Sequence, residues 1–236
     1  MFNFAHVNEN IEIMNYIKTL VLKYDTHLRQ HEIKLFRGAI VAEPGNSDDI
    51  LFHDHDGDGL RYAYPLIQYK TIDSRAAIVA VGEGTDSLAR MTYPFTRELT
   101  IGTDRRPFTL VQSMACSTDV EFTDTPLKYS ISQWLPLNND NYREYAETND
   151  ISLRLDLLKR MLVGNILSFA KGIGLHLDDQ VEVALPRLPE AKPVTFKAQK
   201  MLSFNATFTV NLRLPSYIGL GKGSSIGYGT IRSRGI

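Results

Sequence analysis

The pattern of apolar and polar positions in the first half of the chain predicts two short helices among several strands. Residues 18–24 (KTLVLKY) alternate between polar and apolar side chains and are rich in β-prone residues, as in a half-buried strand. Ile33, Phe36 and Ile40 recur at helical spacing within residues 31–41 and would share one helix face. The remaining elements are expected as strands at 60–70 and 75–82 joined by a turn at Asp73-Ser74, a helix at 85–93, and strands through the sequences ELTIG and FTLVQSMA.

The second half of the chain repeats most of this order. Its clearest helix is residues 151–172, where Leu158, Leu162 and Ile166 recur at helical spacing and Asp150 is placed to cap the first turn. No second helix is expected in this half. The strands are expected at 127–137, 181–186, 196–212 and 228–234.

Strand–helix–strand–strand–helix–strand is the order of a ferredoxin-like domain. We therefore predict the α+β class, with two tandem ferredoxin-like (RRM-like) domains. The Thr125-Pro126 pair is the expected boundary, which gives an N-terminal domain of residues 1–124 and a C-terminal domain of residues 125–236. The two halves share no visible sequence repeat, so this prediction depends on the order of elements.

Composition places the chain among globular proteins. Of its 236 residues, 43% are hydrophobic and 22% are charged, which excludes disordered, collagen-like and fibrous chains. Cys116 is the only cysteine, so no internal disulfide is expected, as in a reducing compartment. No apolar run approaches the ~20 residues needed to cross a bilayer, and the first residues lack a signal-peptide pattern. A cytoplasmic protein without a membrane partner is expected.

The formal net charge of −1 hides an asymmetry along the chain. Every Asp and Glu lies at or before Glu190, and the residues after it include seven Lys and Arg and no acid. A basic segment of this kind is expected of a protein that binds a phosphate backbone. The alternative is a solvated basic face that balances an acidic body.

The most informative segment is SYIGLGKGSSIGYGTIRSR, residues 216–234. Five glycines occur within eleven of its residues, beside Lys222. Glycine lets a backbone approach a ligand closely, and clustered main-chain N–H groups with a cation suit a phosphate chain. Two familiar phosphate-binding patterns are absent: Gly223 follows Lys222 where a P-loop needs Ser or Thr, and Ser224 stands where a dinucleotide fingerprint needs its third glycine. The alternative is a glycine-rich hairpin connection without a ligand.

The pattern GLG at 219–221, five residues, then GYG at 227–229 resembles the C-terminal glycine-rich motif of the CRISPR-associated endoribonucleases that process repeat RNA, the "Cas six" group. In that family the motif ends the second of two ferredoxin-like domains, just before a final strand. Seven residues remain after this motif, enough for that strand. A second stretch, HDHDGDGLRYAYPLIQYK (53–70), is similar to a family segment in which a closely spaced histidine pair precedes a Tyr-rich strand that ends in a basic residue.

The resemblance implies a metal-independent endoribonuclease that cuts CRISPR repeat transcripts and needs no cofactor. RNA supplies its own nucleophile, the 2′-hydroxyl next to the scissile phosphate. The protein must then provide a base, an acid for the 5′-oxygen leaving group and cations for the developing charge. Imidazole titrates near neutrality, and His53 and His55 are the expected base and acid, in either order. The expected products carry a 5′-hydroxyl and a 2′,3′-cyclic phosphate. The expected RNA-binding residues are Gly219, Gly221, Lys222, Gly223, Gly227, Gly229, Arg232, Arg234, Arg61 and Lys70.

Three alternatives stay open. His27 and His31 are the next candidates for the acid–base pair. A catalytically inactive RNA-binding relative would keep the basic glycine-rich segment without a working site. A calcium or small-ligand module would use the HDHDGDG loop, whose acids and second glycine fall at positions 1, 3, 5 and 6 of an EF-hand loop, although Pro65 stands at position 12 where a Glu is needed. The expected partner is CRISPR repeat RNA, with other subunits of a CRISPR effector complex and a second copy of the chain as candidate protein partners.

Overall fold

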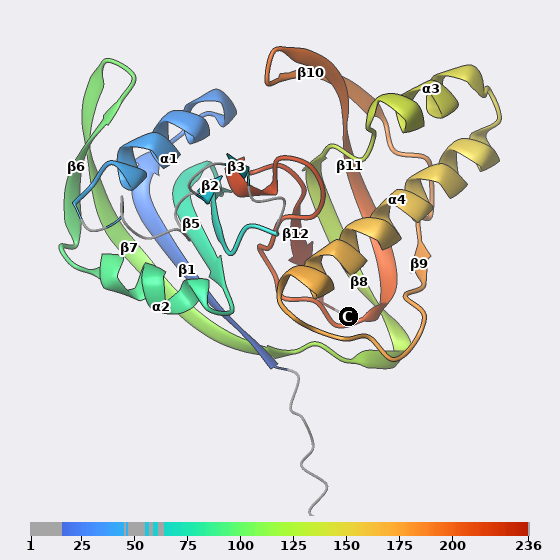
Figure 1. The fold of residues 1–236 in the computed structure, drawn as a ribbon, viewed down its shortest axis with the longest axis horizontal. Helices are drawn as coiled ribbons and strands as arrows, with labels where there is room; N and C mark the ends of the chain where they lie inside the picture. The colour runs from blue at the N-terminus through green and yellow to red at the C-terminus, as the bar shows by residue number, and fades with distance from the viewer. Residues whose placement is uncertain (1–15, 45, 47–54, 57–58, 61–63, 236) are drawn as a thin grey trace, which may run out of the picture.

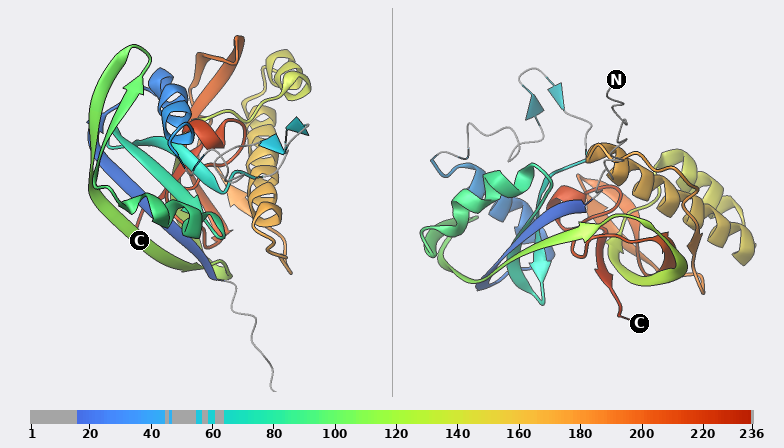
Figure 2. Two further views of the ribbon diagram at one scale, coloured as in Figure 1. Left: turned by 60° about the vertical axis from the view of Figure 1, so that its left-hand side comes forward. Right: turned by 90° about the horizontal axis from the view of Figure 1, so that it is seen from below.

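The computed structural model of the chain describes residues 16–44, 46, 55–56, 59–60 and 64–235, with only the backbone at 55–56 and 59–60. It contains two large antiparallel sheets, each with helices packed on one face (Figures 1 and 2). The mixed α+β class and the two tandem ferredoxin-like domains are confirmed. None of the helices within the described residues combines the length and the apolar character that a bilayer crossing requires.

The N-terminal sheet has the strand order β4-β5-β1-β7-β6. Strands β4, β5, β1 and β7 correspond to the second, third, first and fourth strands of a ferredoxin-like domain. Strand β6 adds a fifth strand at the edge of the sheet. The turn predicted at Asp73-Ser74 is confirmed, because both residues have positive φ, at 53° and 61°, as in a tight two-residue hairpin. The elements are β1 (Tyr16–His27), η1 (Gln30–Glu32), α1 (Ile33–Val41), β2 (His55–Asp56), β3 (Gly59–Leu60), β4 (Ile67–Ile72), β5 (Arg75–Val81), α2 (Gly84–Ala89), η2 (Arg90–Thr92), β6 (Thr96–Ile101) and β7 (Asp104–Asp119).

The C-terminal sheet has the strand order β10-β11-β8-β12, which is again second, third, first and fourth. Its longest helix is α4, which begins and ends where the sequence pattern predicts and is capped by the Asp150 carboxylate. Between β11 and β12, where a ferredoxin-like domain has its second helix, the chain forms the glycine-rich segment with one short 3₁₀ turn. The elements are β8 (Phe122–Trp134), α3 (Asn139–Glu147), α4 (Ile151–Gly172), β9 (Val183–Ala184), β10 (Ala191–Phe196), β11 (Gln199–Leu212), η3 (Ser224–Ile226) and β12 (Thr230–Ser233).

The structure differs from the expected elements in several places. The strand expected at 196–212 is β11 from Gln199 onward. Lys197 and Ala198 take positive φ values of 47° and 62° and reverse the chain, so that β10, which was not expected, pairs with β11 as a hairpin. Helix α3 was not predicted, since its sequence is strongly polar and only Tyr145 is buried. Helix α2 begins at Gly84, one residue before the helix expected at 85–93, and no side chain caps it.

Two long strands carry the chain from one sheet to the other. Strands β7 and β8 are separated by only two residues, and their ribbons run from the N-terminal sheet into the C-terminal sheet (Figure 1). The Thr125-Pro126 pair, expected as the domain boundary, lies within β8. Each sheet has its own core: Tyr24, Phe36 and Phe108 are fully buried in the first, and Trp134 is fully buried in the second.

Candidate functional site

The glycine-rich segment, taken here as residues 216–229, lies between the two domains and bonds to strand β4 of the N-terminal one (Figure 1). The main-chain N–H of Gly219 donates to the Gln68 side-chain oxygen at 2.8 Å. The Lys70 ammonium donates to the main-chain oxygen of Tyr217 at 2.6 Å. From η1 of the same domain, the Gln30 side-chain amide donates to the Ile226 main-chain oxygen at 3.2 Å. The segment therefore joins the two domains through polar contacts.

Close packing explains two of the glycines. Gly229 has a φ of 65°, and a Cβ there would lie 1.9 Å from the main-chain oxygen of Leu220. Gly227 has a φ of 88°, and its Cβ would lie 2.9 Å from the Ile33 side chain of α1. Any larger residue at these positions would strain the backbone or push the domains apart.

The main-chain N–H groups of the outer glycines are already used within the protein. Gly219 donates to Gln68, as above, and the Gly229 N–H donates to the main-chain oxygen of Gln133 at 3.2 Å. A phosphate held by these two groups would have to displace these bonds. Gly221 and Gly223 are half-buried and lie on either side of Lys222, the exposed cation of the segment. The part of the segment open to a ligand is therefore its tip, residues 221–223.

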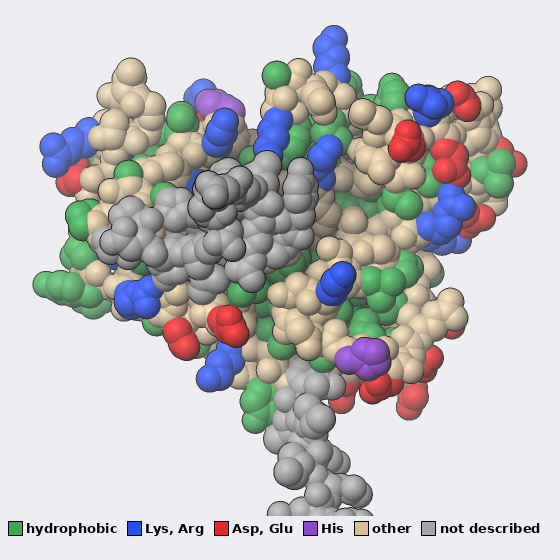
Figure 3. Space-filling view, viewed as in Figure 1, with side chains coloured by type: hydrophobic (Ala, Val, Ile, Leu, Met, Phe, Trp, Pro, Cys, Tyr) green, Lys and Arg blue, Asp and Glu red, His purple; other side chains and the backbone are tan. Residues whose placement is uncertain are grey.

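The cations of the last strand have different surroundings. The Arg232 guanidinium pairs with the Asp73 carboxylate at 3.0 Å and lies over the Tyr217 ring at 5.3 Å from its centroid. Arg232 and Lys23 together hold the pKa of Asp73 below its usual value. Arg234 is exposed beyond the end of β12. Figure 3 shows several Lys and Arg side chains in the upper middle of the molecule, around the central part of this face.

The structure corrects the expected role of Lys70. Its side chain is fully buried, and its ammonium donates to Gln68 at 2.8 Å as well as to Tyr217. Burial lowers the pKa of Lys70 to about 7. Lys70 thus lies inside the domain interface rather than on a surface that RNA can reach.

Gln68 is at the centre of this interface and was missed by the sequence analysis. It is fully buried, its amide donates to the Tyr64 hydroxyl and the Pro65 main-chain oxygen, and its carbonyl oxygen accepts from both Lys70 and Gly219. Burial raises the pKa of the Tyr64 phenol, so this hydroxyl stays protonated. A glutamine within a Tyr-rich strand carries no pattern that would have marked it.

The histidine segment is described only in part. His53 and Arg61 lie outside the described residues, and the backbone of His55 is in β2, paired with Leu60 of β3. Of the acidic positions in the alternative calcium loop, only the Asp56 backbone is described, so that alternative stays a prediction.

The chain immediately after the histidine segment is anchored between the domains. Tyr64 packs against α4. A Cβ added at Gly172 would lie 2.1 Å from the Tyr64 Cβ. The Tyr64 ring makes an edge contact with the Phe169 ring, at 5.2 Å between centroids. Only a glycine at 172 permits this approach. Tyr64 therefore holds the start of β4, and the chain that leads into it, against the C-terminal domain.

The two other candidate histidines are exposed and differ in location. His27 ends β1, whereas His31 lies in η1 next to Gln30, whose amide reaches Ile226 of the glycine-rich segment. The structure thus brings the His31 backbone to the border of this segment.

Comparisons with known proteins agree with this geometry. The family models for the Cas6b N-terminal domain and the Cas6b C-terminal domain match residues 15–116 and 121–234. A crystal structure of Cas6b is 30% identical, with a TM-score of 0.85, and the match covers 93% of this chain and all of that one. A crystal structure of the CRISPR RNA processing endoribonuclease Cas6b is 26% identical over the same shares, with a TM-score of 0.71.

A further match is a protein of Methanocaldococcus jannaschii described as uncharacterized, which is 36% identical over 106 residues, 44% of this chain and 71% of that protein. The two family models together span both domains, and the two Cas6b structures share their arrangement. The chain therefore belongs to the Cas6b family of CRISPR RNA processing endoribonucleases.

Proposed function

We propose that this protein cuts CRISPR repeat RNA without a metal ion, with His53 and His55 as general base and general acid. The 2′-hydroxyl next to the scissile phosphate loses its proton to one imidazole and attacks the phosphorus. The bond to the 5′-oxygen breaks, and this oxygen takes a proton from the other imidazole. The products are a 2′,3′-cyclic phosphate on one fragment and a 5′-hydroxyl on the other. Membership of the Cas6b family is the observation that carries the proposal.

The short connection between His55 and Tyr64 limits how far the histidine pair can lie from the domain interface. Tyr64 is fixed at the domain interface, and three residues separate it from Leu60, so the four Cα–Cα steps between them reach about 14 Å at most. His55 pairs with Leu60, which adds about 5 Å between their Cα atoms. The His55 backbone is therefore within about 20 Å of Tyr64.

Cations near the tip of the glycine-rich segment would stabilise the extra negative charge of the transition state. Lys222 is exposed there, and a charge in place before the reaction needs no reorganisation. Arg61, Arg232 and Arg234 are proposed to hold neighbouring phosphates, with the main chain at Gly221 and Gly223. The proposed site of action is the cytoplasm, and other CRISPR effector subunits and a second copy of the chain stay candidate partners.

Cleavage of labelled repeat RNA in excess EDTA tests the proposal. We expect cleavage at one position, with product ends that identify a cyclic phosphate and a 5′-hydroxyl. RNA with a single 2′-deoxy nucleotide at that position is the matched control and should stay uncut, because its nucleophile is missing. Cleavage that needs an added divalent cation, or that proceeds on the 2′-deoxy RNA, would contradict the mechanism. Tight binding without any cleavage would indicate the inactive RNA-binding relative.

A further inference from the structure

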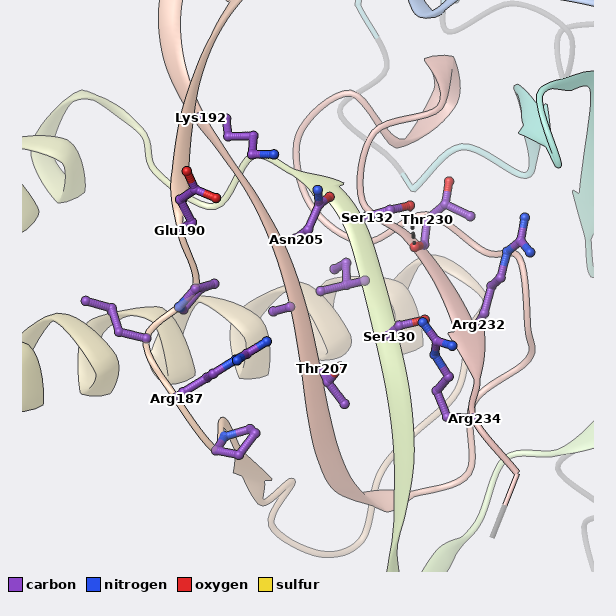
Figure 4. Close-up of a pocket in the computed structure, with 15 residues that line it drawn as sticks. Ser130, Ser132, Arg187, Glu190, Lys192, Asn205, Thr207, Thr230, Arg232 and Arg234 are labelled. Atoms are coloured by element: carbon purple, nitrogen blue, oxygen red, sulfur yellow. Dashed lines mark hydrogen bonds between the residues drawn. The ribbon is translucent and has the colours of Figure 1, made fainter.

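A solvent-open trough of about 820 Å³ lies on the face of the C-terminal sheet opposite α4. We call it the sheet trough. It crosses β11, β8 and β12 and is closed on one side by the chain from Pro186 to Lys192 (Figure 4). Residues 216–229 do not line it.

Charged side chains form both edges of the sheet trough. Arg187 and Lys192 stand on one side and Arg232 and Arg234 on the other, with Glu190 as the single acid among the residues that line it (Figure 4). Arg187, Lys192 and Arg234 are exposed, and none of the ion pairs among the described residues includes them. Arg232 is paired with Asp73, which lies outside the trough. The three other cations against one carboxylate leave an excess of positive charge, which favours a polyanion.

The floor of the trough consists of small polar side chains. Ser130 and Ser132 of β8 and Asn205 and Thr207 of β11 lie between the two basic edges (Figure 4). Their neighbour Ile131 is 1% exposed and points into the core under α4, because successive residues of a strand face opposite sides. The sequence of each strand thus gives the sheet one apolar face and one face of hydroxyls and an amide.

This floor favours contacts with the sugar and the phosphate over contacts with the bases. None of the residues that line the trough is aromatic, so it lacks the rings on which single-stranded bases commonly stack. Hydroxyl and amide groups can bond to 2′-hydroxyls and phosphate oxygens without reading sequence.

The width of the trough suits one strand of RNA. The sheet order is β10-β11-β8-β12, so the backbones of Lys192 on β10 and Arg232 on β12 lie about 15 Å apart. A single sugar–phosphate chain fits between the two basic edges, whereas a duplex is wider than this floor.

We propose that the sheet trough binds a single-stranded stretch of the repeat RNA through its phosphates and 2′-hydroxyls. It is a sequence-independent anchor for RNA that lies away from the scissile phosphate. This inference rests on the proposed function, because it names where part of that RNA lies.

Salt-dependent binding by an Arg187→Ala/Lys192→Ala double variant tests the proposal. Both residues are exposed and project from the loop and edge strand, so the fold should be kept, with an unchanged melting temperature. The matched control is Lys159→Ala/Arg160→Ala, which removes the same charge from α4, on the opposite face of the sheet. Each protein is titrated with repeat RNA blocked by a 2′-deoxy nucleotide at the cleavage position, so that binding is measured without cleavage.

We expect the trough variant to bind about tenfold more weakly at moderate salt, and its slope of log affinity against log salt to fall by about 1.4, or ~0.7 for each lost phosphate contact. The control should bind like the wild type. Equal losses in the two variants, or an unchanged slope in the trough variant, would overturn the proposal. Because the readout is binding, a wild-type protein that binds RNA but does not cut it would contradict the proposed function while leaving the trough testable.

Discussion

The Lys70 ammonium of the N-terminal sheet donates a hydrogen bond of 2.6 Å to the main-chain oxygen of Tyr217 in the glycine-rich segment. The contact crosses the interface between the domains and is fully buried on the Lys70 side. The glycine-rich segment is thus bonded to a buried lysine that cannot itself reach RNA. Its position depends on β4, the strand that follows the histidine segment.

The burial of Lys70 makes stability depend on pH. The pKa of Lys70 is about 7 in the folded protein and 10.5 for a free lysine, so between these values the unfolded chain binds more protons than the folded one. Stability should therefore rise with pH across this window, and the penalty for burying the charge is greatest below pH 7. Lys70→Met removes the titration but keeps an unbranched apolar side chain.

Urea unfolding at pH 7 and pH 9 checks this prediction. The difference in the free energy of unfolding between the wild type and Lys70→Met should shift by about 2 kcal/mol in favour of the wild type at the higher pH. The comparison between the two proteins cancels the titration of the other groups. A difference that is the same at both values of pH would show that Lys70 keeps an ordinary pKa.

Gly229 and Gly164 should respond to alanine in opposite directions. Gly229→Ala places a Cβ 1.9 Å from the Leu220 oxygen at a φ of 65° and should lower the free energy of unfolding by about 2–5 kcal/mol. Gly164 lies within α4, and beyond its chain neighbours and the backbone of the helix itself no atom lies within 4 Å of its added Cβ. Gly164→Ala should therefore raise the free energy of unfolding by about 1 kcal/mol. Chemical denaturation measures both. A Gly229→Ala protein as stable as the wild type would show that the segment can move aside.

Lys222→Ala should weaken RNA binding without changing stability. Its side chain is exposed at the tip of the glycine-rich segment, and the loss of one phosphate contact should lower the salt slope of the affinity by ~0.7. Arg105→Ala is the control, because Arg105 is 73% exposed and lies on the N-terminal sheet. Filter binding at several salt concentrations checks the pair. The same slope in Lys222→Ala as in the wild type would remove Lys222 from the RNA interface.

The strongest periodic signals gave the right elements. The helix at 151–172 was predictable because its apolar residues recur over six turns and Asp150 stands at its start. The position of the turn between β4 and β5 was predictable because two polar residues, Asp73 and Ser74, separate two apolar runs. Ferredoxin-like order then follows from the sequence of elements, which is why the two sheets share one topology.

Other features could not be read from the sequence, for physical reasons. Lys197 and Ala198 reverse the chain without a glycine, asparagine or proline to mark the turn. Helix α3 buries little beyond Tyr145, so it has almost no apolar stripe, although Asn138 caps it and could have marked its start. Lys70 and Gln68 lie on β4, which is buried on both faces. The alternation of polar and apolar residues along this strand therefore does not reveal that both side chains are buried. Arg187 and Lys192 come together with Arg232 only through the folding of the sheet.

The single-turnover rate of repeat RNA cleavage in EDTA by a His53→Ala/His55→Ala variant tests the central claim most directly. The rate should fall at least about 100-fold, as expected when a general acid and base are both lost, while RNA affinity is largely kept. His176→Ala is the matched control, since its side chain is 91% exposed in the C-terminal domain, and it should cut at the wild-type rate. Cleavage by the double variant at the wild-type rate would contradict the account and direct attention to His31, beside the glycine-rich segment.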